Sequence, residues 1–166
     1  AATLVLPDGA GTIIPPAGVP ASAMPAGSVI QVKQAVVNVT QQATTSTSFI
    51  DATGLTVDIT PASATNKILV MANIETGMGA SGDNTTNRYR VLRDGTTQIA
   101  MQTSRHYDYG NSGVYGAQAV AITYLDSPNT TSQVNYKVQL KMENGSNAFI
   151  NSENGTSTIT VIEVVA

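Results

Sequence analysis

The sequence contains no cysteine and no tryptophan among its 166 residues, and only 11% of the residues are charged. The absence of cysteine excludes disulfides, thiolate metal sites and a cysteine nucleophile. The charged fraction is less than half of the roughly 25% found in ordinary soluble domains. The polar surface must therefore consist mainly of Thr, Ser, Asn and Gln, which suits an assembled protein better than one that attracts a charged ligand.

Long apolar runs and basic patches are also missing. No run approaches the roughly 18 apolar residues of a membrane-spanning helix, so we expect no membrane partner. Lys and Arg are scattered, apart from one local cluster at Arg88, Arg90 and Arg93. We expect these arginines to lie on a solvated strand face or to form a salt bridge between subunits. We expect no nucleic-acid partner, because nucleic-acid binding requires a basic patch.

Most of the prolines gather in residues 1–27, together with several glycines. Proline removes the N–H that a sheet ladder needs, so this stretch cannot form the centre of a sheet. Short apolar clusters nevertheless interrupt it, at Leu4, Val5, Leu6, Ile13 and Ile14. We interpret residues 1–27 as an extended arm whose apolar clusters bind a partner, either a neighbouring subunit or another protein. The alternative is a flexible tail with incidental aliphatic residues.

From Ser28 onward, apolar and polar residues alternate with the period of two that indicates β-strands. The clearest strands are expected at 29–39, 55–59, 67–74, 88–92, 97–103, 117–125, 133–142 and 158–165. The strands at 117–125 and 133–142 are expected to be the longest. The stretch 67–74 is apolar on both faces, because Leu69 and Met71 alternate with Ile68 and Val70. We therefore expect that strand to be covered on both sides.

Turn signals separate these strands. Asp94-Gly95 predicts a tight hairpin, because glycine accepts the positive φ of a primed turn. Pro128 and Asn129 predict a connection between two strands, and Asn144-Gly145 predicts another turn. Eight to ten strands without helical periodicity predict an all-β fold. We expect an antiparallel jelly-roll sandwich over residues 28–166, preceded by the extended arm.

Catalytic and metal-binding patterns are weak. His106 is the only histidine, so a zinc site is not expected, and the acidic residues show no paired motif for glycoside hydrolysis. His106 near Asp108, with Ser104 or Ser112 as a nucleophile, is the best catalytic arrangement available, but no strand–turn–helix elbow surrounds either serine. We expect no enzyme activity and no cofactor, and we rank a glycan-cleaving enzyme as the last alternative.

Three tyrosines lie close together at Tyr107, Tyr109 and Tyr115, among Gly, Asn and Ser residues. This composition is typical of adaptable contact surfaces, because a tyrosine ring supplies contact area at a low entropy cost. The tyrosines are candidates for a recognition loop that binds a host-surface glycan or a protein. The alternative is that the rings pack on neighbouring strands.

Four separated segments resemble a domain common in tailed-bacteriophage virion proteins, often found at the C-terminus of tail-fibre-like proteins of marine and cyanobacterial phages. The segments are "MPAGSVIQVKQ" (24–34), "TSTSFIDATGLTVDITPASATNKILVMANI" (45–74), "LDSPNTTSQVNYKVQLK" (125–141) and "STITVIEVVA" (157–166). The resemblance implies a structural virion component, similar to trimeric jelly rolls of the tumour-necrosis-factor-like type. It transfers no functional residues, because the shared segments are strands and turns.

The chain differs from that family in having a short arm in place of a long fibre shaft. This difference favours a capsid decoration (cement) protein, a homotrimer that binds the major capsid protein or another virion protein on the capsid exterior. The expected location is the virion, after synthesis in the cytoplasm of a bacterial host. The alternative is a short tail-fibre or head-fibre tip that binds a host-surface glycan.

Overall fold

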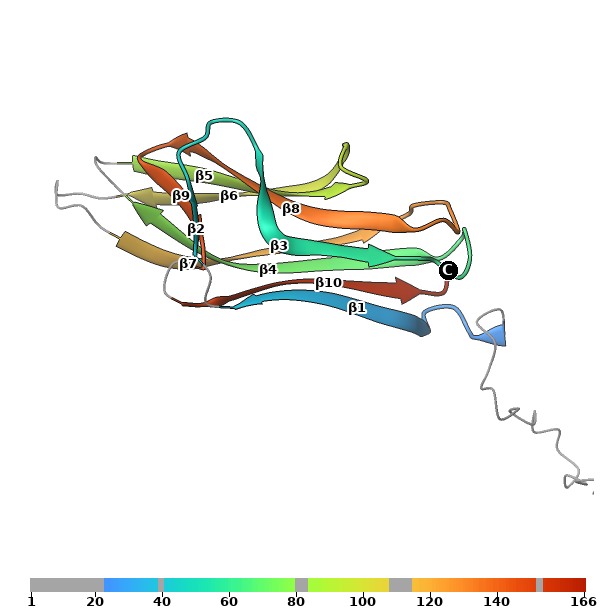
Figure 1. The fold of residues 1–166 in the computed structure, drawn as a ribbon. Coiled ribbons are helices and arrows are strands. Elements are labelled where there is room, and N and C mark those ends of the chain that lie inside the picture. The colour runs from blue at the N-terminus through green and yellow to red at the C-terminus, as the bar shows by residue number, and fades with distance from the viewer. Residues whose placement is uncertain (1–22, 39–40, 80–83, 108–114, 152–153) are drawn as a thin grey trace, which may run out of the picture.

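The computed structural model describes residues 23–38, 41–79, 84–107, 115–151 and 154–166, and Figure 1 shows their fold. These residues form ten strands and no α-helix. The strands are β1 (Val29–Asn38), β2 (Gln42–Thr44), β3 (Ile50–Ile59), β4 (Lys67–Gly79), β5 (Asn84–Arg93), β6 (Thr97–Tyr107), β7 (Tyr115–Asp126), β8 (Val134–Asn144), β9 (Asn147–Ile150) and β10 (Thr156–Val164).

The strands form two antiparallel sheets that pack face to face (Figure 1). The six-stranded sheet has the order β1-β10-β4-β9-β2, and β7 pairs with the other edge of β4. The four-stranded sheet has the order β3-β8-β5-β6. Without the short strands β2 and β9, the two sheets are β1-β10-β4-β7 and β3-β8-β5-β6, the double Greek key of a jelly roll. The expected all-β, antiparallel jelly-roll sandwich is therefore confirmed.

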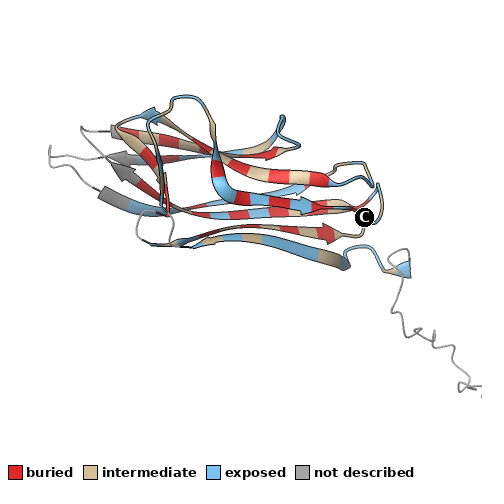
Figure 2. Ribbon diagram, in the orientation of Figure 1, coloured by how far each residue is buried: buried red, intermediate tan, exposed pale blue. Residues whose placement is uncertain are grey.

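The core lies between the two sheets and follows from the period-two pattern of the sequence. In β8 every second residue from Val134 to Leu140 is buried, and in β10 every second residue from Ser157 to Glu163 is buried. Figure 2 shows this alternation as red bands along both sheets. The largest side chains with almost no exposed area are Tyr89, Tyr136, Leu55, Ile59, Ile68, Ile74, Leu92, Ile122, Leu140, Ile150 and Ile159.

The turn predictions are confirmed in detail. Asp94 and Gly95 have φ values of 50° and 71°, as a type I′ turn requires, and they join β5 to β6. Asn129 has a φ of 54° in the connection after Pro128, between β7 and β8. Gly145 has a φ of 112° between β8 and β9.

Two expectations about the strands are wrong. The longest strand is β4, with 13 residues, because its last four residues also pair with β7 and β9. The second face of β4 is not covered by the described residues, since Met71 is 37% exposed there. Within the described part of the chain, one face of the six-stranded sheet is therefore left open to solvent.

Candidate functional site

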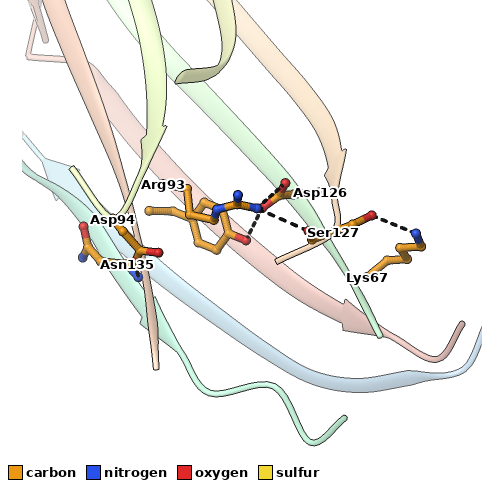
Figure 3. Close-up of polar contacts among 7 residues, drawn as sticks. Lys67, Arg93, Asp94, Asp126, Ser127 and Asn135 are labelled. Carbon is orange, nitrogen blue, oxygen red and sulfur yellow. Dashed lines mark hydrogen bonds and ion pairs between the residues drawn. The ribbon is translucent and has the colours of Figure 1, made fainter. Parts of the chain in front are cut away.

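A polar network joins the two sheets at the end of the sandwich where β5 and β7 end and β8 begins. Arg93 Nη1 donates to both carboxylate oxygens of Asp126, at 2.9 and 2.8 Å, and to the carbonyl oxygen of Ser127 at 3.4 Å. The hydroxyl of Tyr136 donates to the same carboxylate at 2.7 Å. Figure 3 shows the Arg93–Asp126 pair beside Ser127, whose hydroxyl accepts a 2.8 Å hydrogen bond from Lys67 Nζ.

Two members of this network are buried. Asp126 and Tyr136 are buried, and burial raises the pKa of the Tyr136 hydroxyl, with a further increase from its hydrogen bond to the Asp126 carboxylate. Arg93 is one member of the arginine cluster noted in the sequence. Its salt bridge forms within the chain, and a salt bridge between subunits stays a prediction. The network stabilises the packing of one sheet on the other and presents no reacting group to solvent.

A second buried carboxylate, that of Glu163, ties β10 to two other segments. It accepts hydrogen bonds from the Gln31 side chain at 2.6 Å, the Ala62 backbone N–H at 2.7 Å and the Asn66 side chain at 2.7 Å. Gln31 lies in β1, whereas Ala62 and Asn66 lie in the connection between β3 and β4. These donors satisfy the buried carboxylate and fix the start of β1.

The chain that leads into β1 is fixed to the end of β10. The N–H of Gly27 donates to Val165 O at 2.8 Å, and the N–H of Val165 donates to Ser28 O at 2.9 Å. Ser28 N–H also closes a turn by donating to Pro25 O at 3.1 Å. The sequence-predicted partner-binding residues of the arm, namely Leu4, Val5, Leu6, Ile13 and Ile14, lie outside the described residues.

Two of the three tyrosine candidates lie at the opposite end of the sandwich. Tyr107 is the last residue of β6, Tyr115 is the first residue of β7, and Tyr109 lies outside the described residues. In the backbone pairing, Tyr107 is opposite Asn84 and Tyr115 is opposite Gly79. The two strand ends therefore belong to different sheets, and whether the tyrosines recognise a ligand stays a prediction.

Ser104, the candidate nucleophile, is buried in β6. Its hydroxyl donates a 2.6 Å hydrogen bond to Gln118 Oε1 of β7. An amide oxygen cannot accept the proton of an attacking serine as a base, so this contact does not activate the hydroxyl. Asp108 and Ser112 lie outside the described residues. Among the described residues there is also no cluster of three or more His, Cys, Asp or Glu side chains that could hold a metal ion.

The outer face of the four-stranded sheet carries most of the paired charges. Lys137 donates to Asp51 at 2.9 Å, and Arg88 forms an ion pair with Glu143. The pKa of Asp51 is lowered, first by a hydrogen bond from Gln139 and then by its bond to Lys137. These pairs form a solvated polar surface, as expected for Arg88.

The outer face of the six-stranded sheet is different. The strand pairing places Val32 of β1, Ile162 of β10, Leu69 of β4 and Leu125 of β7 opposite one another in a single row. Val32 and Leu125, at the two ends of this row, are each 55% exposed. We call these four residues the apolar row. The sequence analysis noted only its β4 member. The same analysis of the second faces of β1, β7 and β10 would have revealed the other three.

No helix among the described residues is long and apolar enough to cross a membrane. No family model and no curated protein matches the sequence. Among solved structures, the chain is similar to a chain of the infectious bursal disease virus Gx strain, with a TM-score of 0.36 and 10% identity over 84% of this chain and 39% of that chain. A second similar chain is VP2 in an infectious bursal disease virus subviral particle, with a TM-score of 0.32 and 8% identity over 84% of this chain and 38% of that chain.

This chain thus spans about two fifths of the length of those solved chains. The strand order of the chain itself defines the jelly roll.

Proposed function

We propose that the protein is a structural component of a bacteriophage virion, a decoration protein that forms trimers on the head and stabilises the shell. In this proposal it is made in the bacterial host cytoplasm and binds the major capsid protein, or another virion protein, through the N-terminal arm. The resemblance of residues 24–166 to tailed-phage virion domains supports the virion assignment.

The observation that carries the proposal is the contrast between the two outer faces of the sandwich. One face has paired charges in contact with water, whereas the other has the apolar row that the described residues leave open. Exposed apolar patches of this kind mark surfaces that are covered in an assembly. The Arg93–Asp126 pair joins the two sheets, and buried Glu163 ties β10 to β1 and to the β3–β4 connection. The sandwich so provides a stiff platform for such contacts.

The arm supplies the attachment in this mechanism. It enters the sandwich through the two backbone hydrogen bonds between residues 27–28 and Val165, so a force on the arm is transmitted directly to β1 and β10. Each CH₂ group that the arm buries in a groove of the shell contributes roughly 0.8 kcal/mol to the binding free energy. The groups come from Leu4, Val5, Leu6, Ile13 and Ile14. Linked copies then bind more tightly than one copy, because each further attachment is intramolecular.

The experiment measures binding of the purified protein to heads of the virus that encodes it, by co-sedimentation. We expect the full chain to sediment with the heads. A chain that begins at Ala23, which keeps the whole described fold, should bind at least tenfold more weakly. A matched variant with Leu4, Val5, Leu6, Ile13 and Ile14 all changed to Ser should behave like the truncated chain. Equal binding by all three proteins would contradict attachment through the arm.

The competing function is that of a short tail-fibre or head-fibre tip that binds a host-surface glycan. It predicts that the isolated chain adsorbs to host cells, and that Tyr107→Ala weakens this adsorption without affecting head binding. Adsorption to cells combined with no affinity for heads would replace the decoration proposal.

A further inference from the structure

We propose that the outer face of the six-stranded sheet is an interface between copies of this chain, centred on the apolar row. This inference rests on the proposed function in one respect, since it names the surface used for the self-association proposed above. It does not depend on attachment to a head.

The two rows that follow the apolar row towards the middle of β4 are uncharged. On one side lie Gln34, Thr160, Met71 and Thr123, and beyond them lie Val36, Thr158, Asn73 and Ala121. Met71 occupies the middle of the face, on the central strand β4, and is 37% exposed. Three successive rows across four strands therefore present aliphatic side chains, a thioether and neutral polar groups to water.

The charges near this face are at its ends. Lys67 lies at the start of β4 and is held by its hydrogen bond to Ser127, while Glu75 lies towards the other end of the strand, near Gly155. Glu163 of β10 points into the sandwich and is fully buried. A charged partner would find few groups to pair with between Lys67 and Glu75. A partner surface that is itself apolar and neutral would lose little hydration free energy by covering this face.

The face is also of the right size for self-association. Strands are about 4.8 Å apart and rise about 3.3 Å per residue, so four strands of about ten residues present a face of roughly 600 Å². A stable interface of standard size buries about 800 Å² on each partner. In a trimer, each copy brings the same row of aliphatic side chains to the threefold axis, and the contact would remove all three rows from water. We therefore assign a second copy as the occupant, in preference to a charged macromolecule.

The edge strand β1 supports this assignment. Among the described strands it pairs with β10 alone, and its outward residues Val32 and Val36 are both exposed. An exposed edge strand with aliphatic side chains is a site of unwanted pairing unless something covers it. An ordered contact with a second copy would remove this hazard at the same time as it buries the apolar row.

The sequence offers a matched pair of variants for the test. Met71 and Met101 have almost equal exposure, 37% and 36%, but Met101 lies on β6 opposite Arg90, on the outer face of the other sheet. The oligomeric state of the full chain and of Met71→Lys, Leu125→Lys and Met101→Lys is measured by sedimentation velocity over a range of concentrations. Thermal unfolding of each variant verifies that it folds.

We expect the full chain and Met101→Lys to form the same oligomer. We expect Met71→Lys and Leu125→Lys to weaken self-association at least tenfold, because each places an unpaired charge in the contact. The proposal is overturned if the full chain is still monomeric at about 1 mM, where even a millimolar dissociation constant leaves oligomers visible. It is also overturned if Met101→Lys weakens association as much as Met71→Lys.

Two further results separate this inference from the proposed function. In the first, the chain beginning at Ala23 no longer self-associates, whereas Met71→Lys associates normally. This result would assign self-association to the arm and overturn the proposed interface. Association that is sensitive to Met71→Lys in a protein with no affinity for heads would support the interface and contradict head decoration.

Discussion

Arg93 and Asp126 meet between the two sheets, where a single guanidinium nitrogen lies 2.9 and 2.8 Å from the two carboxylate oxygens. The two residues are 33 positions apart in the sequence and belong to different sheets. The Tyr136 hydroxyl, the third member of the network, donates to the same carboxylate. Because this ion pair is largely buried, removing one partner leaves the other charge without compensation.

We therefore expect Asp126→Asn to lower the free energy of unfolding by about 3 kcal/mol. Denaturant-induced unfolding measures the change, with an unchanged slope showing that the transition remains two-state. Asp51→Asn is the matched control, since it breaks the solvated pair with Lys137 and should cost less than about 1 kcal/mol. Equal losses in the two variants would show that burial does not strengthen the inner pair.

A second prediction concerns stability at alkaline pH. Burial raises the pKa of Tyr89 and Tyr136 in the folded protein, whereas the unfolded side chains ionise near 10. Above pH 10 the unfolded state therefore loses protons that the folded state keeps, and the free energy of unfolding falls as the pH rises. Each tyrosine adds up to about 1.4 kcal/mol per pH unit to this fall, and the contribution is fully present below pH 10.

Unfolding of the original protein and of Tyr136→Phe at several pH values above 10 tests this effect. Tyr136→Phe should make the decline with pH shallower, although it also removes one donor to Asp126 and so lowers stability at every pH. Both proteins contain the same lysines, so the difference between their two pH profiles does not depend on lysine ionisation. An identical decline in the two proteins would contradict the assignment to Tyr136.

A third prediction compares two glycines with positive φ. At Gly145, with a φ of 112°, an added Cβ would lie 2.7 Å from Thr85 Oγ1 and 3.1 Å from Thr85 Cβ. At Gly27, with a φ of 86°, an added Cβ would meet nothing within 4 Å. We expect Gly27→Ala to cost about 1 kcal/mol for the backbone alone, and Gly145→Ala to cost about 2 to 3 kcal/mol because crowding is added.

Thermal or denaturant unfolding of both variants measures this difference. Adding Thr85→Ala should recover part of the loss in Gly145→Ala, since it removes the two closest atoms, and a double-mutant cycle isolates that coupling. A coupling energy near zero would mean that the turn moves away from Thr85 without cost.

A fourth prediction concerns the buried carboxylate of Glu163. Glu163→Gln replaces one acceptor oxygen by an NH₂ group that faces the donors of Ala62, Asn66 or Gln31. We expect a loss of about 2 to 3 kcal/mol, because a buried donor is left without an acceptor. Glu143→Gln, at the more exposed ion pair with Arg88, should cost less than about 1 kcal/mol in the same unfolding experiment.

The strands and turns could be predicted from the sequence where the signal is local. The alternation in β3 and β8 and the Asp94-Gly95 turn require only neighbouring residues, and the structure confirms them. The strands β2 and β9 were missed, because three and four residues are too short to show a period. The last residues of β4, Thr76 to Gly79, contain two glycines, and they extend the strand only because β7 and β9 pair with them.

The long-range contacts could not be predicted. Nothing in the sequence indicates that Asp126 would accept hydrogen bonds from Arg93 and Tyr136, because the pairing depends on how the two sheets stack. The apolar character of Leu69 and Met71 was visible in the sequence. The expectation that this face would be covered was wrong for the described residues of a single chain, since covering it requires material beyond them.

The two ends of the sandwich are chemically and topologically distinct. Residues 27–28 and Val165 meet at one end, whereas β6 finishes at Tyr107 and β7 starts at Tyr115 at the other. A particle that held this protein by its leading segment would carry the end of β6 and the start of β7 on the side away from its own surface. A foreign peptide inserted there would be displayed outward in many copies, while the same peptide added after Ala166 would be crowded against the attachment point.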